Sequence, residues 1–379
     1  MKQVDTRRAH AQFIDSVISG RPPTSAPDHR IRDSWRRCVS SYQLNPDRAG
    51  HPTIVSGAEL KHRRGESELL YSIAQIEMMT LARLLNAPVG VMLTDHEGVI
   101  LAYTGAREFT EVARNSGLCE GAVWSEAEQG TNGMGTCLAI REPVLIEEDE
   151  HFLSQNVALT CCGAPIRDGR GDLIGALNIS GRLRLSAAPT LALVRLAVQN
   201  VENRVLLAEH QPHHHLLRFH PHREFISTAG EGILAIDDAG TVTGANLSAL
   251  EWLGVSDHAS LCGQTVERLF GLDLGRLEAL GHDPAFARPL PSRERGSLCY
   301  GIIQRATDHA SAGSRTAPRC CDNRLMEAEH EALREVLQRH GWNVSRAAAQ
   351  LRISRRTLHR KLKWHGLQRY CAWESGESD

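Results

Sequence analysis

The chain has 379 residues, of which 41% are hydrophobic and 23% are charged, and its formal net charge at pH 7 is −2. This composition is typical of a globular protein, excludes a disordered or fibrous one, and predicts two or three domains at this length. No apolar run is long enough to cross a bilayer, and the N-terminal residues lack the apolar core of a signal peptide. We therefore expect a cytoplasmic protein that does not contact the membrane.

The first 65 residues predict an irregular helical segment. Residues 31–38, IRDSWRRC, are amphipathic and follow a loop that contains three prolines. We interpret this segment as one that docks on, or caps, the domain after it.

Residues 66–185 predict a mixed α/β domain with an antiparallel sheet. Helical periodicity is found at 69–85 and 107–115, and a long loop follows at 124–135. Short apolar runs bounded by turn residues predict strands. These strands are 88–94, 99–103, 143–146, 159–166 and 173–179. Elements in this order are typical of a sheet that is covered by helices.

This domain resembles the GAF domain of acetoin-catabolism-type transcriptional activators. The resemblance rests on EAEQGTNGMGTCLA at 126–139, on the REPVLI that follows it, and on CGAPIRDGRGDLIGALNISG at 162–181. GAF domains enclose a small-molecule pocket between the sheet and its covering loops. The resemblance therefore implies an effector site beneath the loop 124–137, with the ligand-binding residues Trp124, Thr131, Asn132, Met134, Cys137 and Cys162.

The glycines of GTNGMGT do not indicate a phosphate-binding loop, because no lysine follows them, and we expect them to permit a compact turn. The ten cysteines of a cytosolic chain should be reduced, and no spacing between them matches a zinc site. Two interpretations of the cysteines near the pocket stay open, a redox-sensing role and small buried thiols. These cysteines are Cys119, Cys137, Cys161 and Cys162.

Residues 186–222 predict a connecting helix and a histidine-rich linker. Apolar residues spaced three and four apart form a seam on the helix, which is either a dimer contact or a face packed on the helix's own domain. The seam consists of Leu191, Val194, Val198, Val201 and Val205. Six histidines lie between His210 and His222, but no cysteine or carboxylate pattern completes a metal site. We therefore expect a solvated linker and no bound metal.

Residues 223–309 predict a second small domain. The segment EGILAIDDAGTVTGANLSALEWLG at 231–254 resembles a PAS domain, in which a strand, a turn, a second strand and an asparagine-led helix follow one another. Nothing in the segment is diagnostic for haem or flavin, so the cofactor stays unknown.

After a linker at 310–322, residues 323–370 predict an all-α unit. An amphipathic helix at 323–340 precedes a short helix at 343–351, a tight turn, and a last helix capped by Ser354. Residues 336–373 contain no acidic residue, and cations lie on the face of the last helix opposite Leu358 and Leu362. A basic helix after a tight turn is typical of a helix-turn-helix that enters the major groove of DNA.

The stretch NVSRAAAQLRISRRTLHRKL at 343–362 resembles the C-terminal DNA-binding domain of the Fis family. In that family the preceding helices form a dimer, so the resemblance implies a homodimer on double-stranded DNA. Arginine forks can read guanine edges, and other cations neutralise phosphates. We expect contacts to DNA from Arg346, Ser354, Arg355, Arg356, Thr357, His359, Arg360 and Lys363.

Activators with this kind of sensor usually carry an ATPase domain before the Fis-like end. This chain has no Gly-Lys pair, which the phosphate-binding loop of that domain requires. We therefore expect a regulator, not an enzyme, that senses a small-molecule effector and binds operator DNA without ATP-dependent promoter opening. RNA polymerase or a full-length activator would be its protein partner.

The expected fold class is a multidomain α/β protein, with GAF and PAS-like antiparallel-sheet sensor domains and a C-terminal all-α Fis-type helix-turn-helix. Two alternatives for the function stay open. One is a GAF-type thiol enzyme that reduces free methionine sulfoxide. The other is a Fis-like architectural protein that binds DNA with little sequence preference.

Overall fold

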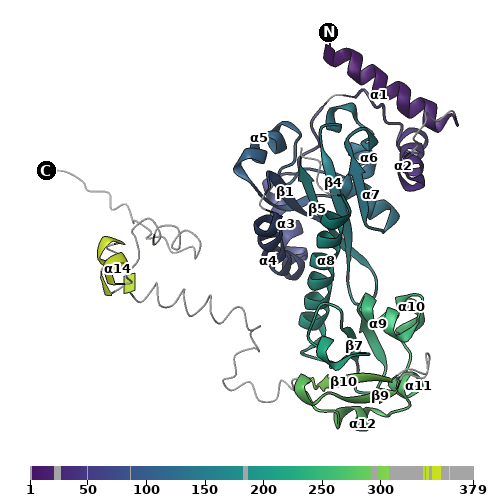
Figure 1. Cartoon of the computed structure of the whole chain (residues 1–379), viewed down its shortest axis with the longest axis vertical. Helices are drawn as coiled ribbons and strands as arrows, with labels where there is room; N and C mark the ends of the chain where they lie inside the picture. The colour runs from purple at the N-terminus through teal and green to yellow at the C-terminus, as the bar shows by residue number, and fades with distance from the viewer. Residues whose placement is uncertain are drawn as a thin grey trace. The chain divides into compact units, whose positions relative to one another are not determined.

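A computed structural model of the chain describes residues 2–20, 27–48, 50–85, 87–181, 187–291 and 298–306, and near the C-terminus residues 336, 337, 339, 340, 344–350 and 358. The chain divides into two compact units, Met1–Asp308 and His309–Asp379. The first unit contains two five-stranded sheets, and Figure 1 shows the long helix α8, Ala187–His210, running from one sheet to the other. The predicted pair of antiparallel-sheet domains is confirmed.

The first sheet has the strand order β2-β1-β5-β4-β3, and every neighbouring pair is antiparallel. Successive side chains of a strand point to opposite faces. In the central strand β1, Met92 therefore joins one core cluster, and Val91 and Leu93 join the other. The strands are β1 Val89–Asp95, β2 Ile100–Gly105, β3 Val144–Glu147, β4 Thr160–Arg167 and β5 Leu173–Gly181.

Helices α4, Glu68–Leu85, and α8 cover one face of this sheet. Leu70 and Ile73 of α4 are buried there with Leu177 of β5. The apolar seam of α8 packs into the same cluster through Val194, Val198, Val201 and Val205. Of the two interpretations of the seam, packing on its own domain is the one that the structure shows.

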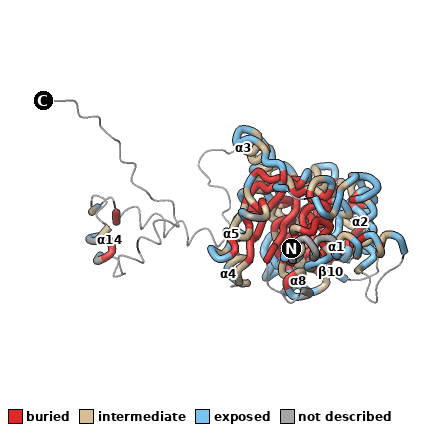
Figure 2. Tube along the Cα trace, turned by 90° about the horizontal axis from the view of Figure 1, so that it is seen from above, coloured by how far each residue is buried: buried red, intermediate tan, exposed pale blue. Residues whose placement is uncertain are grey.

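The other face is covered by α7, Gly133–Ile140, together with the N-terminal helices α1, Lys2–Ile18, and α2, His29–Ser40. Figure 2 shows the buried residues in red at the centre of this unit. The expected loop at 124–135 is wrong in part, because it contains the helix α6, Glu126–Gln129, and the start of α7. The remaining helices and turns of the domain are α3 Gly57–Glu66, α5 Arg107–Asn115, η1 Glu148–Glu150 and η2 Ser154–Asn156.

Three hairpins close with the same local device, an aspartate followed three residues later by a glycine. In each turn the aspartate Oδ1 accepts hydrogen bonds from two backbone N–H groups further along the chain. The glycine of each turn has φ between +78° and +88°, a conformation that only glycine adopts at no steric cost. The pairs are Asp95 with Gly98, Asp168 with Gly171, and Asp237 with Gly240.

The second sheet has the order β8-β7-β6-β10-β9. Its central strand β6, His215–His220, pairs with β7 and β10, so part of the expected histidine-rich linker is a buried strand of this domain. The other strands are β7 Gly232–Ile236, β8 Val242–Ala245, β9 Arg288–Pro291 and β10 Leu298–Gln304. The helices and turns are η3 Arg223–Phe225, α9 Leu247–Leu253, α10 His258–Leu261, α11 Val266–Phe270, α12 Leu274–Glu278 and η4 Pro284–Phe286.

A set of hydrogen bonds joins the two sheet domains at the end of α8. Asn246, the N-cap of α9, donates from Nδ2 to Asn203 Oδ1 of α8 at 2.8 Å. The backbone N–H of Ala245 donates to the carbonyl of Gly169 at 2.7 Å. Glu202 Oε1 accepts from the backbone N–H of Arg167 at 2.8 Å. Both sheets are therefore tied to the same part of one helix.

The carboxyl group of Glu202 predicts a pH dependence of stability. Burial raises its pKa from 4.5 to about 7. In this window the folded chain retains a proton that the unfolded chain releases, so the Glu202 contribution to stability is lost as pH rises from 4.5 to 7. The loss is on the order of 3 kcal/mol. Glu202→Gln should therefore flatten the fall in the urea midpoint between pH 5 and pH 8.

The matched control is Glu251→Gln, which changes an exposed carboxylate of α9. It should leave the pH profile of the urea midpoint unchanged. Equal pH profiles for the wild-type chain and Glu202→Gln would contradict the assignment.

Candidate functional site

The first sheet carries a short row of hydrogen-bonded polar side chains on the face that α7 covers. His151 Nε2 lies 3.3 Å from Cys161 Sγ, and Cys161 Sγ lies 3.1 Å from Ser180 Oγ. Asn178 Nδ2 donates to Ser180 Oγ at 2.9 Å. All four side chains are buried, and strand register places Cys161 directly opposite Ser180. We call these four residues the polar chain.

The polar chain ends at an acceptor that is not used. Asn178 Oδ1 is buried and has no hydrogen-bond partner among the described residues. A buried polar group without a partner costs about 1–3 kcal/mol. All four members are neutral, because burial lowers the pKa of His151 to about 4 and raises the pKa of Cys161 to about 11. The group is suited to a neutral ligand that donates a hydrogen bond.

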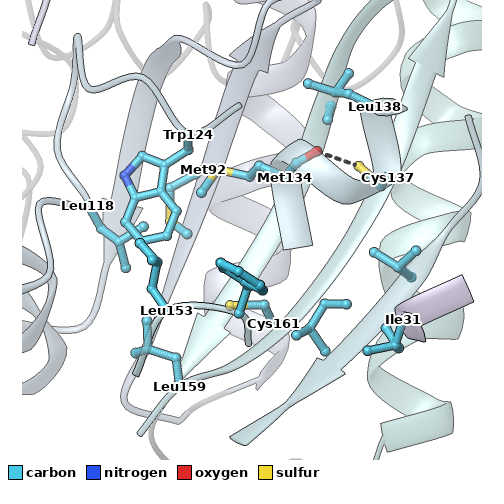
Figure 3. Close-up of a cluster of buried hydrophobic side chains, with 14 of the residues drawn as sticks. Ile31, Met92, Leu118, Trp124, Met134, Cys137, Leu138, Leu153, Leu159 and Cys161 are labelled. Atoms are coloured by element: carbon cyan, nitrogen blue, oxygen red, sulfur yellow. Dashed lines mark hydrogen bonds between the residues drawn. The ribbon is translucent and has the colours of Figure 1, made fainter. Parts of the chain in front are cut away.

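Apolar side chains surround the polar chain. Figure 3 shows Trp124, Met92 and Met134 close together, with Leu153 and Cys161 in the same cluster. Each of these side chains is at most 2% exposed. The Trp124 ring is held in place because its Nε1 donates to the carbonyl of Gly117 at 3.0 Å.

Asn132 fixes the N-terminus of α7 and links it to residues 124–130, which we call the covering segment. Its Oδ1 accepts from the backbone N–H groups of Met134 at 3.0 Å and Gly135 at 2.9 Å. Its Nδ2 donates to the carbonyls of Trp124 and Gly130. An N-cap asparagine satisfies N–H groups that the first helical turn leaves unpaired. Asn132 is therefore a positioning residue for α7.

The glycines of the motif allow α7 to lie directly against the sheet. A Cβ at Gly133 would overlap Asn178 Oδ1, a Cβ at Gly163 would overlap the carbonyl of Gly133, and a Cβ at Gly135 would overlap the backbone of Glu126. Gly130 has φ +63° and ends α6. Of the glycines expected to permit a compact turn, only Gly130 lies in the short connection between α6 and α7, whereas Gly133 and Gly135 lie in the first turn of α7 and permit its close packing.

The structure brings five of the six predicted ligand residues together around α7, all of them buried. They are Trp124, Thr131, Asn132, Met134 and Cys137. Cys162 is not brought to them, because it lies on the opposite face of the sheet in the cluster under α4 and α8. Its neighbour Cys161 faces α7 in its place.

Sequence reasoning missed His151, Ser180 and Asn178. The sequence did contain a signal for two of them. Asn178 and Ser180 are polar residues at alternate positions of LIGALNISG, an otherwise apolar strand, and so they share one face. His151 lies between β3 and β4, in a segment separate from β5, and no local pattern predicts its contact with Cys161.

The buried thiols are poorly suited to redox chemistry. Burial raises the pKa of Cys38 and Cys162 to about 12, and it raises the pKa of Cys137 further. Reactive cysteines need an accessible thiolate, and these thiols are protonated at neutral pH. Burial therefore favours the interpretation of small buried thiols for Cys137, Cys161 and Cys162, whereas Cys119 is half-buried.

A cleft lies at the joint between the two sheet domains. It has a volume of about 510 Å³ and lies between the end of α7, the middle of α8 and the start of α9. Its lining includes Arg141, Arg195, Glu202, Leu247 and Glu251. Cations and carboxylates are mixed along this lining, which therefore has no clear preference for a charged ligand.

The C-terminal unit has a small core. Val336 and Leu337 are buried with Ala347 and Ala348 of α14, Val344–Gln350, and with Leu358. This agrees with the apolar faces expected for the helix-turn-helix. Arg346 lies on α14 and is exposed. The other predicted DNA contacts lie outside the described residues: Ser354, Arg355, Arg356, Thr357, His359, Arg360 and Lys363.

The described part of the chain contains neither a cluster suited to a metal ion nor a helix suited to span a membrane. No three histidine, cysteine or acidic side chains there are grouped so that they could hold a metal ion. No helix there has the length and apolar character needed to cross a membrane.

The comparisons with known proteins agree with this architecture. The family model described as the MimR N-terminal domain matches residues 2–203, more than half of the chain. The chain belongs to this family. A PAS domain model matches residues 222–290, and the model of the Fis family of bacterial regulatory proteins matches residues 324–364. Residues 291–323 separate these two matches and are too few for an ATPase domain, so the chain has none at that position.

Two of the curated relatives are named as regulators of acetoin genes. The acetoin catabolism regulatory protein of Cupriavidus necator is 34% identical over 73% of this chain and 42% of its own length. The acetoin dehydrogenase operon activator AcoR of Bacillus subtilis is 32% identical over 40% of this chain and 25% of its own length. This chain therefore spans less than half the length of these relatives. Among solved structures, the DhaR(N)–DhaL complex of E. coli covers 73% of this chain and 99% of its own, with TM-score 0.46 and 16% identity.

Removing the Asn132 side chain should destabilise the first domain. Asn132→Ala leaves two buried N–H groups and two buried carbonyls without their partner. We expect a loss of about 2–4 kcal/mol in the free energy of unfolding, measured by urea titration. The matched control is Ser56→Ala, which removes the exposed N-cap of α3 and should cost about 1 kcal/mol or less. Equal losses in the two variants would contradict the positioning role.

Proposed function

We propose that the chain is a DNA-binding transcriptional regulator that senses a small neutral metabolite in its first domain and binds operator DNA as a homodimer through its Fis-type end. The observation that carries the proposal is the buried polar chain with its unused acceptor at Asn178, inside an apolar core, in a chain that also has a Fis-family match. Buried polar groups inside an apolar cluster are what small-molecule sites use to orient a ligand.

The chemistry of the polar chain limits the class of effector. Its members are an imidazole held neutral by burial, a protonated thiol, a hydroxyl and an amide. A carboxylate or phosphate would need a cation to offset its desolvation. A small alcohol or hydroxyketone can donate a hydrogen bond to Asn178 Oδ1 and place its carbon atoms against the surrounding apolar side chains. Acetoin is the first compound to test, because two relatives are named for acetoin catabolism.

The mode of action follows from the order of the domains. The chain has no ATPase domain between its PAS and Fis matches. We infer that it does not open promoters with ATP, and that it acts by recruiting RNA polymerase, by repression, or by assisting a full-length activator. DNA binding itself requires no nucleotide, because cations and helix placement supply it.

The DNA-binding assignment predicts the effect of a double substitution. Arg355→Ala combined with Arg356→Ala removes two cations from the proposed recognition helix. Specific operator affinity should fall by about 10- to 1000-fold, since one good base contact gives about 1–3 kcal/mol of discrimination. Footprinting on promoter fragments and circular dichroism would measure binding and folding together.

The control replaces two exposed arginines of the first domain, Arg36→Ala and Arg83→Ala. It should leave the footprint unchanged at the same salt concentration. An unchanged footprint for the double variant at 355 and 356 would overturn the assignment. Equal affinity of the wild-type chain for operator and random DNA would favour an architectural protein instead.

The effector-site assignment predicts that filling the interior uncouples sensing from DNA binding. In Gly133→Ala the added methyl group overlaps Asn178 Oδ1 and Cys161 Cβ, so both side chains must shift from their present positions. Operator affinity without effector should stay within a factor of about three, and the change caused by acetoin or a related alcohol should disappear. The measurement is operator affinity with and without the compound.

The matched control is Gly65→Ala in α3, where the new methyl group meets no atom within 4 Å. This variant should respond to the compound as the wild-type chain does. Urea midpoints of both variants show whether they are folded. A folded Gly133→Ala chain with a full effector response would contradict the site.

A further inference from the structure

The N-terminal helices complete the core in which the polar chain lies. Ile14 and Val17 of α1 belong to the same cluster as Met134 and Cys161, and so do Ile31, Trp35 and Cys38 of α2. Figure 3 shows Ile31 within this cluster. The side chains of Trp35 and Cys38 are fully buried. The two helices therefore form a wall of the proposed effector site.

The two helices are attached by side chains alone. Among the described residues, no hydrogen bond between backbone groups joins α1 or α2 to the rest of the domain. The other walls are strands of the first sheet, which backbone hydrogen bonds join to one another, and helices that pack on this sheet. An element held only by side chains can detach without breaking a ladder. Detachment of the N-terminal helices therefore breaks no backbone hydrogen bond of the sheet.

A buried ion pair fastens α2 to the site. Arg37 donates from Nε to Glu126 Oε2 at 2.7 Å and from a terminal nitrogen to Glu126 Oε1 at 2.9 Å. The Glu126 side chain is 2% exposed, whereas the Arg37 side chain is 31% exposed. A bidentate arginine–carboxylate pair is strong and directional. Removal of the arginine would leave a buried carboxylate without its cation.

The ion pair reaches a predicted ligand residue through one hydroxyl group. Ser34 Oγ donates to Glu126 Oε1 at 2.5 Å and lies 2.6 Å from Thr131 Oγ1. Thr131 directly precedes Asn132, which caps α7. The position of α2 is therefore linked to the position of α7.

Further contacts attach the helices to residues 148–156 between β3 and β4, which we call the covering loop. Trp35 Nε1 donates to the carbonyl of Glu150 at 2.9 Å, and His10 Nδ1 lies 2.9 Å from Ser154 Oγ. This loop also carries His151, a member of the polar chain. The helices thus contact both segments that enclose the site.

We propose that α1 and α2 form a lid over the effector site and that the Arg37–Glu126 ion pair is its latch. The effector enters when the latch releases and α2 separates from α6 and the covering loop. This inference rests on the proposed function, because it assumes that the interior is where the effector binds.

Thiol trapping on the full chain tests the lid. Cys38 lies on the buried face of α2, and Cys137 and Cys161 lie in the cluster that the lid covers. Cys162 is buried on the other face of the sheet, and Cys299 is buried in the second domain. The probe is N-ethylmaleimide at pH 8.5, with labelling at each cysteine quantified by mass spectrometry. Arg37→Gln should raise the labelling rates of the three lid thiols at least tenfold and leave Cys162 and Cys299 unchanged.

The control is Arg36→Gln on the same helix, where the arginine pairs with the exposed Asp33. It should not change any labelling rate. The lid is overturned if Arg37→Gln leaves the three thiols as slow as in the wild-type chain. It is also overturned if all five thiols accelerate by the same factor, because that result is global loosening.

A second measurement uses the wild-type chain and does not depend on the folding of a variant. Lid opening exposes less surface than the unfolding of a whole domain, so the labelling of Cys38, Cys137 and Cys161 should depend less steeply on urea than that of Cys299. Equal urea slopes would overturn the lid. Neither readout uses an effector or DNA. The lid can therefore be overturned in a chain that still responds to an effector, and the lid can be supported in a chain that does not respond to one.

Discussion

The close approach of α7 to strands β4 and β5 is the contact on which the first domain's site depends. Gly133 and Gly163 face each other there with no room for a Cβ on either. Because the helix lies so near the sheet, Asn132 can reach two carbonyls of the covering segment, and Met134 and Cys137 fill the interior. A helix held further away would leave an apolar cavity and unpaired backbone groups. The glycine motif thus specifies the distance between two layers.

Much of the first domain was predictable because its chemistry is local. The three Asp-x-x-Gly turns, two in the first domain and one in the second, are recognisable in the sequence. Each needs an aspartate that accepts from its own turn and a glycine with positive φ within four residues. The periodicity at 107–115 predicts α5 with its observed bounds, and the periodicity at 69–85 predicts α4 to within one residue. In both helices one apolar face packs on the sheet.

The parts that were missed depend on contacts between distant residues. Glycine lowers helix propensity by about 1 kcal/mol, so GTNGMGT predicts a loop, but packing on β4 and β5 makes it helical. The histidines of β6 predict a solvated segment, yet His220 is buried against Trp252, with ring centroids 4.7 Å apart. Cys162 is a predicted ligand residue, but strand register places it on the face of the sheet opposite α7 and places Cys161 on the α7 face. Register is not a local property of the sequence.

The joint at the end of α8 is where a change in the first domain can reach the second. Strand β4 ends at Arg167, whose N–H is bound by Glu202, and the following turn accepts from Ala245. Hydrogen bonds of this kind weaken steeply with distance and angle, so a displacement of β4 of about 1 Å must break one or repack the joint. In the proposed regulator, which has no ATPase domain between its PAS and Fis matches, the free energy available for coupling would be the difference in effector affinity between two arrangements. Such coupling free energies are typically about 1–3 kcal/mol, or 5- to 150-fold in affinity. A free-energy difference of this size can shift the population between two arrangements only if the joint has few other arrangements to adopt.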